Sequence, residues 1–371
     1  MINASFEIVE KVEKHPNADR LDVVTVSGYT VISQKDTIKP GDRVFFIRED
    51  SQINFDKEKF PWHNGIETYL GKKGRVKSIR LRGIFSSGII IPADEIVSSL
   101  IIKFGKYKEG IPGILDPNTQ QIEINYDELN KMFENEEILN KYCGIEHYNP
   151  PAIGTAFGQL TMKGNLPYGL TKTDEENWQN LRKLPFGEKV LLTRKKDGTS
   201  CTVTFDRNGY YKVCGRNYEY SLDKDNIYTK YSKKLIDIIL ESKIYETLEE
   251  GKYLVIRGEI AGKGIQSKSF NIDCIDEPDF YVFKTMIWDE RNKNNSEMGY
   301  YDSPYHFTLF KDKIKELTGK DITTVPIIGE FQLTQELINK YSNAPASEGE
   351  GIVINHKNGS FKVKSLDYIS R

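Results

Sequence analysis

The sequence predicts an α+β chain in two parts, a small β-barrel followed by a larger domain of antiparallel sheets with flanking helices. Short β-rich runs separated by turns fill about the first hundred residues, and helical spacing of apolar residues first appears near residue 130. A Pro-rich stretch at Asn149-Pro150-Pro151 then precedes a region of alternating strands and helices. We therefore expect one domain over 1–150 and a second over 151–371.

Composition limits what kind of protein this is. The 371 residues carry 52 basic and 54 acidic side chains, a net charge of -2, so any surface for nucleic acid must be local. No apolar run approaches the roughly 18–20 residues of a membrane helix, and we expect no membrane partner. The four cysteines are dispersed without zinc-ligand spacing, which favours free thiols and a cytoplasmic location.

The first domain is predicted from its strands. β-Rich runs occur at Leu21–Val26, Tyr29–Ser33, Val44–Ile47, Arg75–Leu81 and Gly88–Ile91. About five strands with Gly-rich corners in this length are typical of a small closed barrel.

The rest of the chain alternates helical and strand patterns. We expect a helix over 130–142, a connector over 149–170, and further helices over 174–184 and 230–248. The strands of the second domain are predicted at Lys189–Arg194, Thr199–Phe205, Tyr210–Cys214, Tyr253–Ile260, Phe280–Trp288, Gly351–Asn355 and Ser360–Lys364.

The most informative motif is Lys195-Lys196-Asp197-Gly198, between two apolar strands. Glycine allows a tight turn there, and the turn brings a lysine to the rim of a sheet. A tetrapeptide of this kind also arises by chance in a chain of this length, and alone it is explained by a solvated hairpin.

Three companions follow it along the chain. Gly258-Glu259 ends one apolar strand, and Glu350 begins another. In Phe361-Lys362-Val363-Lys364, period-two alternation places both lysines on one face and both apolar residues on the other. Taken singly, each is the usual solvated residue of a strand end or edge.

Taken in order, these motifs resemble the covalent nucleotidyltransferase superfamily of ATP-dependent ligases and mRNA capping enzymes. The resemblance implies an ATP substrate, a Mg²⁺ or Mn²⁺ cofactor and a lysine that becomes linked to AMP. It also implies the roles of individual residues: Lys195 as the nucleophile, Glu259 on the ribose, Phe283 on the base, Glu350 with the metal, Lys362 and Lys364 on the phosphates, and Ser200 and Arg216 at the nucleotide.

Two features favour the RNA ligases within this superfamily. DNA ligases and capping enzymes usually carry Arg five residues after the nucleophile, whereas this chain has Ser200. Those enzymes also carry an OB domain after the Lys-x-Lys strand, for which the seven residues after Lys364 leave no room.

The N-terminal part has its own resemblance. His15-Pro16-Asn17-Ala18-Asp19-Arg20-Leu21 is similar to the opening of tRNA-binding-type OB barrels. An N-terminal OB barrel joined to a C-terminal nucleotidyltransferase (ATP-grasp-like ligase) domain is the layout of RNA ligase family five. The resemblance therefore implies an ATP-dependent RNA ligase that joins 3′-OH and 5′-phosphate ends, with a nicked duplex as the expected RNA partner and a monomer as the expected state.

Lys195 must lose its proton before it can act as a nucleophile. An ordinary lysine has a pKa near 10.4, so only about one in a thousand is neutral near pH 7.4. We expect nearby cations, a divalent metal and Lys196, to disfavour the ammonium form.

A basic stretch in the first domain is the candidate RNA surface. It contains Lys72, Lys73, Arg75, Lys77, Arg80 and Arg82. OB barrels bind single strands through such grooves, although a solvated hairpin explains the same pattern.

Two other functions stay open at this point. One is a polynucleotide ligase acting mainly on DNA, or a capping-type nucleotidyltransferase. The other is a non-catalytic RNA-binding protein that uses only the OB barrel.

Overall fold

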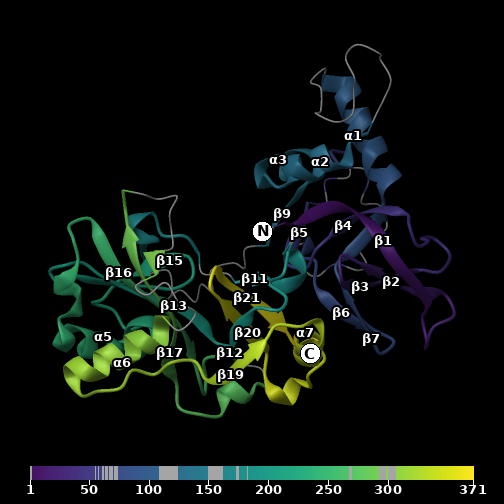
Figure 1. Cartoon of the computed structure of the whole chain (residues 1–371). Helices are drawn as coiled ribbons and strands as arrows, with labels where there is room; N and C mark the ends of the chain where they lie inside the picture. Colours follow the sequence, from purple (N-terminus) through teal and green to yellow (C-terminus); the bar gives the residue numbers. More distant parts are fainter. Residues whose placement is uncertain are drawn as a thin grey trace. The chain divides into compact units, whose positions relative to one another are not determined.

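The computed structural model describes residues 2–54, 56, 58–60, 62, 66, 70, 74–107, 124–148, 162–172, 175–181, 183–266, 270–291, 298–299 and 306–371, with the backbone alone for 102–107 and 298–299. Its contacts divide the chain into two compact units, Met1–Pro150 and Pro151–Ile369. Figure 1 shows the elements of both units.

Unit 1 is built on a curled five-stranded antiparallel sheet in the order β3-β2-β1-β4-β8. The strands are β1 (Ala4–Lys14), β2 (Leu21–Val26), β3 (Tyr29–Gln34), β4 (Arg43–Ile47) and β8 (Ile89–Pro92). A hairpin of β6 (Ser78–Leu81) and β7 (Ile84–Ser87) precedes β8, and β5 (Ser51–Ile53) pairs with β9 (Ile145–His147). The backbone N–H of Ile32 donates to Ser86 Oγ at 2.9 Å, which links β3 to β7.

The strand β4 shows why the core of unit 1 has two parts. After Arg43 its residues, Val44 to Ile47, are all apolar and buried, because successive side chains point to opposite faces and both faces are covered. Phe46 packs in a cluster with Val24 and Tyr29, whereas Phe45 packs with Leu129 and Leu139 of the helices that cover the outer face.

Three helices complete unit 1: α1 (Ala93–Tyr107), α2 (Tyr126–Phe133) and α3 (Glu136–Cys143). The expected single helix over 130–142 is wrong, because the chain forms two helices with a break between them. The side chain of Asn135 accepts hydrogen bonds from Glu137 and Ile138 and so begins α3 with its own N-cap. Strand β1 and helix α1 were missed by the sequence patterns.

Unit 2 contains two larger sheets. The first has the order β10-β15-β14-β13-β16-β17-β18, and the second β11-β21-β20-β12-β19. The strands of the first are β10 (Met162–Asn165), β13 (Thr199–Phe205), β14 (Tyr211–Cys214), β15 (Tyr218–Tyr220), β16 (Lys252–Ala261), β17 (Asp279–Asp289) and β18 (Met298–Gly299). Those of the second are β11 (Glu176–Asn177), β12 (Lys189–Lys195), β19 (Ile327–Gln332), β20 (Gly351–His356) and β21 (Gly359–Lys364).

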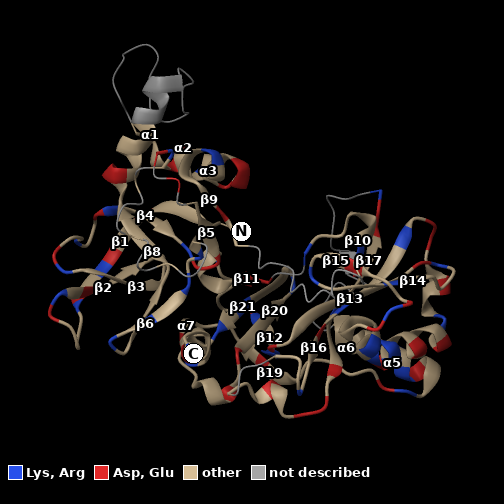
Figure 2. Ribbon diagram, turned by 180° about the vertical axis from the view of Figure 1, so that it is seen from behind, with Lys and Arg blue, Asp and Glu red and all other residues tan. Residues whose placement is uncertain are grey.

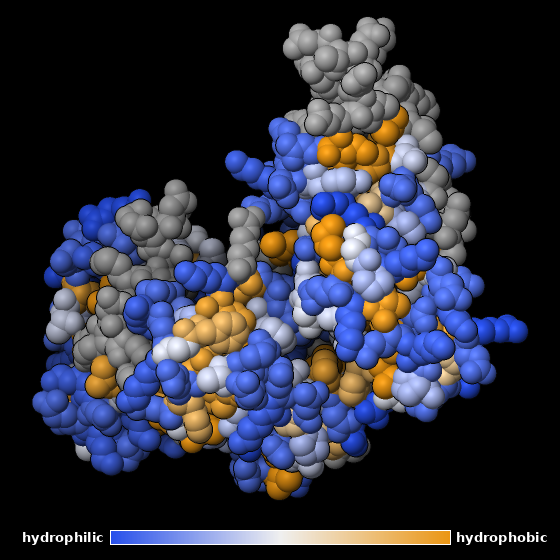
Figure 3. Space-filling view, turned by 45° about the vertical axis from the view of Figure 1, so that its right-hand side comes forward, coloured by the Kyte–Doolittle hydropathy of each residue, from blue (hydrophilic) through white to orange (hydrophobic). Residues whose placement is uncertain are grey.

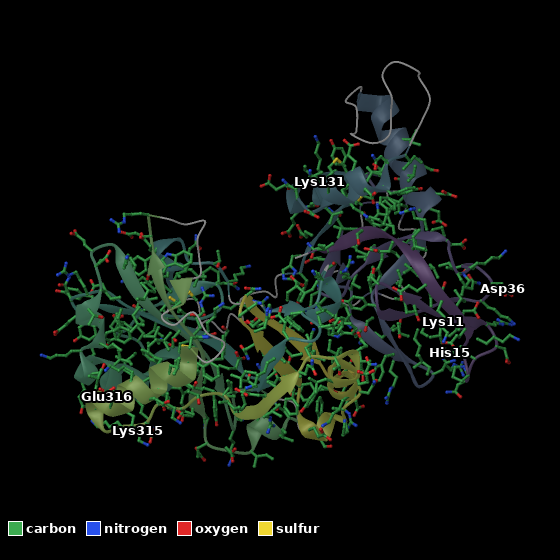
Figure 4. The ribbon with its side chains drawn as sticks, viewed as in Figure 1. Lys11, His15, Asp36, Lys131, Lys315 and Glu316 are labelled. Carbon is green, nitrogen blue, oxygen red and sulfur yellow. The ribbon has the colours of Figure 1, made fainter. Side chains whose placement is uncertain are left out.

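Helices cover the outer faces of these sheets. α5 (Ile227–Ser242) and α6 (His306–Thr318) lie together over the sheet that contains β17 (Figure 1). α7 (Gln335–Ser342) packs on the apolar face of β20 and β21, and α8 (Leu366–Ile369) follows β21. Figure 4 shows Lys315 and Glu316 on the solvent side of α6.

Most predicted strands of unit 2 are confirmed to within about two residues, but two other expectations are wrong. The helix expected over 174–184 is a short strand, Glu176–Asn177, followed by a 3₁₀ turn at Trp178–Asn180, while Asp174 lies outside the described residues. Glu176 and Asn177 pair with Phe361 and Lys362, so sheet pairing overrides local propensity. The expected connector over 149–170 contains β10, which belongs to the first sheet.

The visible surface is mostly hydrophilic (Figure 3), as expected when the sheets bury their apolar residues under helices. Figure 3 shows hydrophilic residues over most of the visible face, with smaller hydrophobic areas between them. In the part of the chain that the structure describes, no helix has the length and apolar character needed to span a membrane.

Candidate active site

Lys195 is the last residue of β12, directly before the turn into β13. It lies opposite Gly351 of β20, and Gly351 lies opposite Lys364 of β21. Residues opposite each other across a sheet project to the same face. Lys195 and Lys364 therefore share one face, next to Glu350, which precedes β20.

An ion pair joins Lys195 to Glu350. Lys195 Nζ lies 2.5 Å from Glu350 Oε2, and their side chains are only 24% and 15% exposed. Burial pushes the pKa of Lys195 down, but the Glu350 and Glu259 carboxylates outweigh it and hold that pKa above its ordinary value. Of the nearby cations, Lys364 opposes this rise, whereas Lys196 pairs with Asp273 at 2.8 Å.

Glu259 lies on the other sheet, opposite Ser200 in the pairing of β16 with β13. Its Oε1 accepts a hydrogen bond from the backbone N–H of Gly198 at 3.2 Å. Burial raises the pKa of Glu259 to about 8, against the opposing effect of Lys195. A carboxyl group whose pKa lies well above its ordinary value thus lies beside the candidate nucleophile.

Strand β21 has the alternation that the sequence predicts. Phe361 and Val363 are buried in the core beneath the sheet, while Lys362 and Lys364 lie on the opposite, partly exposed face. The positive charge of Lys364 is close enough to oppose the rise in the pKa of Lys195. Two cations therefore flank the face on which Lys195 stands.

A cleft of about 420 Å³ opens between the two sheets of unit 2. Phe283 lines it, and Phe283 is the extra residue of a β-bulge, since Arg257 pairs with Lys284 and Gly258 with Val282. A bulge re-aims a side chain away from the regular strand alternation. Arg257 lines the cleft as well and donates from Nη2 to the backbone carbonyl of Thr171 at 2.8 Å.

Arg216 lies in the bend between β14 (Tyr211–Cys214) and β15 (Tyr218–Tyr220). Lys195, Glu259, Glu350 and Lys364 come together, and Ser200 lies next to them opposite Glu259.

The carboxylates suit a divalent metal that keeps most of its own ligands. Among the described residues, no group of three or more His, Cys, Asp or Glu side chains could hold a metal ion by itself. Glu350 and Glu259 still present hard oxygen donors beside Lys195. Mg²⁺ typically retains several waters and uses one or two carboxylates together with phosphate oxygens, so these residues fit such an ion.

The opposite side of the Lys195 turn carries residues that the sequence patterns missed. Asp273 is fully buried and pairs with Lys196 at 2.8 Å and Arg194 at 3.2 Å. Tyr368 donates from its hydroxyl to Asp197 Oδ2 at 2.6 Å. The Arg194–Asp273 and Asp197–Tyr368 contacts join positions 79 and 171 residues apart, and no local spacing signals them.

In unit 1 the candidate RNA residues separate into two groups. Lys77, Arg80 and Arg82 are exposed on or beside the β6–β7 hairpin, where Lys and Arg are seen in blue in Figure 2, and Arg80 lies over the ring of Phe85 at 4.5 Å. Arg75 instead pairs with Asp50 at 2.5 Å and lies over the Tyr148 ring. The expected strand over 75–81 begins only at Ser78, and Lys72 and Lys73 lie outside the described residues.

Comparison with known families decides the identity of unit 2. Residues 188–367 match the RNA ligase family, and every motif from Lys195 to Lys364 lies inside that range. Residues 188–367, 180 of the 371 residues, thus form a segment of the RNA ligase family. Residues 3–93 match an OB-fold domain, which confirms the predicted layout of an RNA ligase with an N-terminal OB barrel.

Solved structures of the Naegleria gruberi RNA ligase share this fold. A mutant of the Naegleria gruberi RNA ligase with ATP and Mn is 24% identical, covers 99% of this chain and 98% of its own, and has a TM-score of 0.69. A mutant with AMP and Mn is 22% identical, with full coverage of both chains and a TM-score of 0.69. A search of the curated proteins finds no match to this chain.

Proposed function

We propose that this chain is an ATP-dependent RNA ligase that joins 3′-OH and 5′-phosphate ends through AMP bound to Lys195. The observation that carries the proposal is the geometry of the Lys195 site. Lys195 lies near the carboxylates of Glu350 and Glu259 and on the same sheet face as Lys364. All of these residues lie inside the segment that matches the RNA ligase family. The Naegleria gruberi ligase with the same fold is solved with ATP and Mn, which supports ATP and a divalent metal here.

In the first step, the neutral amine of Lys195 attacks the α-phosphorus of ATP. A P–N bond forms, the bond to the bridging oxygen breaks, and pyrophosphate leaves. The ammonium found in this state must first lose a proton, and Glu350 at 2.5 Å is positioned to accept it. Lys362 and Lys364 would stabilise the charge that builds on the phosphoryl oxygens.

Two further steps complete the reaction. The 5′-phosphate oxygen of RNA attacks the AMP phosphorus, which breaks the P–N bond and returns the Lys195 amine. The 3′-OH of the other strand then attacks the RNA 5′-phosphorus, forms the phosphodiester bond and releases AMP. Mg²⁺ or Mn²⁺ bound near Glu350 supplies Lewis-acid stabilisation of phosphate charge.

The other assignments belong to the same proposal. Phe283 would stack on the base in the cleft between the sheets, Glu259 and Ser200 would contact the ribose, and Arg216 the nucleotide. Residues 151–371 would carry nucleotide transfer, and 1–150 would bind RNA through Lys77, Arg80 and Arg82 as well as Lys72, Lys73 and Arg75. We further propose a monomer that acts at nicks in a duplex, in the cytoplasm, where its four cysteines stay free thiols.

The decisive experiment is covalent labelling of Lys195. Purified protein is incubated with Mg²⁺ or Mn²⁺ and α-labelled ATP or GTP, and intact and peptide mass spectra locate the adduct. We expect AMP on Lys195 when ATP is supplied and no adduct when GTP is supplied. Lys195→Ala should carry no label, while Lys189→Ala on the same strand should keep it. A GMP adduct would favour a capping-type enzyme, and no adduct with either nucleotide would favour a non-catalytic RNA-binding protein.

A second assay separates RNA from DNA ligation. Nicked duplexes with either RNA or DNA on the 3′-OH side are offered to the labelled enzyme. We expect sealing with RNA at the 3′-OH side. Equal sealing of an all-DNA nick would favour the polynucleotide ligase.

A further inference from the structure

One buried carboxylate binds the residues on both sides of Lys195. The side chain of Asp273 is 0% exposed and lies 3.2 Å from Arg194 Nη2 and 2.8 Å from Lys196 Nζ. Its Oδ2 also accepts a hydrogen bond from the backbone N–H of Asp197 at 3.0 Å. Asp273 thus contacts the residue before the candidate nucleophile and the two residues after it.

The segment around Asp273 holds the backbone of the same turn. Asn271 Oδ1 accepts from the backbone N–H of Asp273 at 2.9 Å, and Asn271 Nδ2 donates to the Asp197 carbonyl at 3.2 Å. Gln266 Nε2 donates to the Gly198 carbonyl at 2.5 Å. Three side chains from 266–273 therefore fix a turn that lies about seventy residues earlier in the chain.

Strand geometry explains why these contacts leave Lys195 available. Successive side chains of a strand point to opposite faces, so Arg194 turns towards Asp273 while Lys195 points to Glu350. Lys196 follows Arg194 to the same partner, and its ammonium also lies 4.5 Å from the centre of the Tyr281 ring. Lys196 is therefore committed to Asp273, and its charge is balanced there.

We propose that Asp273 is a positioning residue for the nucleophile: by binding Arg194, Lys196 and the Asp197 backbone, it holds Lys195 in line for attack on ATP. This inference rests on the proposed function. Attack needs the reacting atoms within about 3–3.5 Å and aligned, and a displacement of about 1 Å costs on the order of 100-fold in rate. A turn fixed from behind by a buried carboxylate meets that demand without touching the substrate.

The test separates the step that uses the Lys195 nucleophile from the step that does not. Asp273→Asn keeps the size of the side chain and removes its charge. Formation of the Lys195–AMP adduct is measured in a single turnover with ATP, and sealing is measured with RNA that already carries AMP on its 5′-phosphate. We expect adduct formation to slow about 100-fold and sealing of the pre-adenylylated RNA to change less than about threefold.

Two further variants make the result decisive. Glu330→Gln removes the partner of Lys189 at the far end of the same strand β12 and should leave both rates unchanged. Asn271→Ala removes the second contact to Asp197 without leaving a buried charge, and should slow adduct formation about tenfold, so it decides the case if Asp273→Asn does not fold.

Two results would overturn the inference. Adduct formation at the wild-type rate in both Asp273→Asn and Asn271→Ala would show that the turn needs no such support. An equal loss in both steps would assign Asp273 to general stability. A wild-type enzyme that forms no Lys195–AMP adduct would instead overturn the proposed function, and this inference with it.

Discussion

Two adjacent lysines at the end of β12 have opposite environments. Lys195 pairs with the partly exposed Glu350, on a face shared with Lys364 and near Glu259. Lys196 pairs with the fully buried Asp273, which also binds Arg194. One lysine thus faces the carboxylates of the candidate site, and the other is bound to a buried partner on the opposite side of the strand.

The difference shows how a strand can support chemistry on one face and structure on the other. A buried carboxylate with several donors strongly resists disruption, because removing one partner leaves an uncompensated charge. On the Lys195 face, burial, with a smaller contribution from the Glu350 carboxylate, raises the pKa of Glu259 to about 8. Substitutions on the two faces should therefore have different effects.

The largest effect is expected from Gly198→Ala, which forces the turn away from its support. A Cβ at Gly198 would lie 2.1 Å from the carbonyl oxygen of Ile260 and 3.0 Å from Ala261 Cβ. We expect the free energy of unfolding to fall by about 2–3 kcal/mol and Lys195–AMP formation to slow about 100-fold. Chemical denaturation and single-turnover labelling measure the two quantities.

Gly164→Ala is the matched control for this substitution. A Cβ at Gly164 on β10 meets no atom within 4 Å, so neither quantity should change appreciably. A wild-type adduct rate in Gly198→Ala would contradict the view that the turn is rigid.

A smaller effect is expected from Glu350→Gln, which tests the other face. Burial lowers the pKa of Lys195, but the Glu350 and Glu259 carboxylates raise it by more than burial lowers it. Removing the Glu350 charge should therefore bring that pKa down. Without ATP or metal, Lys195 should then react several times faster with a small amine-specific reagent near pH 8, measured by peptide mass spectrometry across pH.

Lys189 serves as the internal reference in that measurement. It lies on the same strand, paired with Glu330, and its reactivity should not change in Glu350→Gln. Unchanged or slower labelling of Lys195 would mean that Glu350 does not control its protonation.

The same contrast explains which parts of the site the sequence predicts. The alternation of Phe361, Lys362, Val363 and Lys364 is local, and a half-buried strand needs such a pattern, so burial confirms it. The ion pair of Lys195 with Glu350 spans 155 residues, and only the family resemblance brought the two together. Asp273 has neither a local pattern nor a recognised motif, and it emerges only from the folded structure.

The fold shows the same limit in two elements. Residues 174–184 have a helical pattern, yet Glu176 and Asn177 pair with β21, a contact more than 180 residues away. Helix 130–142 divides because Asn135 satisfies backbone N–H groups that a continuous helix would bond to carbonyls. Both errors arise where a specific hydrogen-bonding partner overrides average propensity.

The smallest effect is the pH dependence of stability from Glu259. Burial raises its pKa to about 8 from an ordinary value of 4.5, so the folded chain binds this proton more tightly than the unfolded chain does. Its contribution to stability is fully present below about pH 4.5 and is lost as the pH rises towards 8. Glu259→Gln removes that loss, because the amide does not ionise.

The melting temperature of Glu259→Gln minus that of wild type should therefore increase by about 3–6 °C from pH 5.5 to pH 8.5. Glu249→Gln, just before β16, is a control of opposite sign, since the hydrogen bond from Lys252 holds the pKa of Glu249 below its ordinary value. The melting temperature of this exposed variant should fall slightly relative to that of wild type as the pH rises through the range in which Glu249 of the unfolded chain ionises. If Glu259→Gln follows wild type at every pH, the carboxyl group is already ionised in the folded state. The face around Lys195 would then carry two full negative charges at neutral pH, which would hold its ammonium form more firmly still.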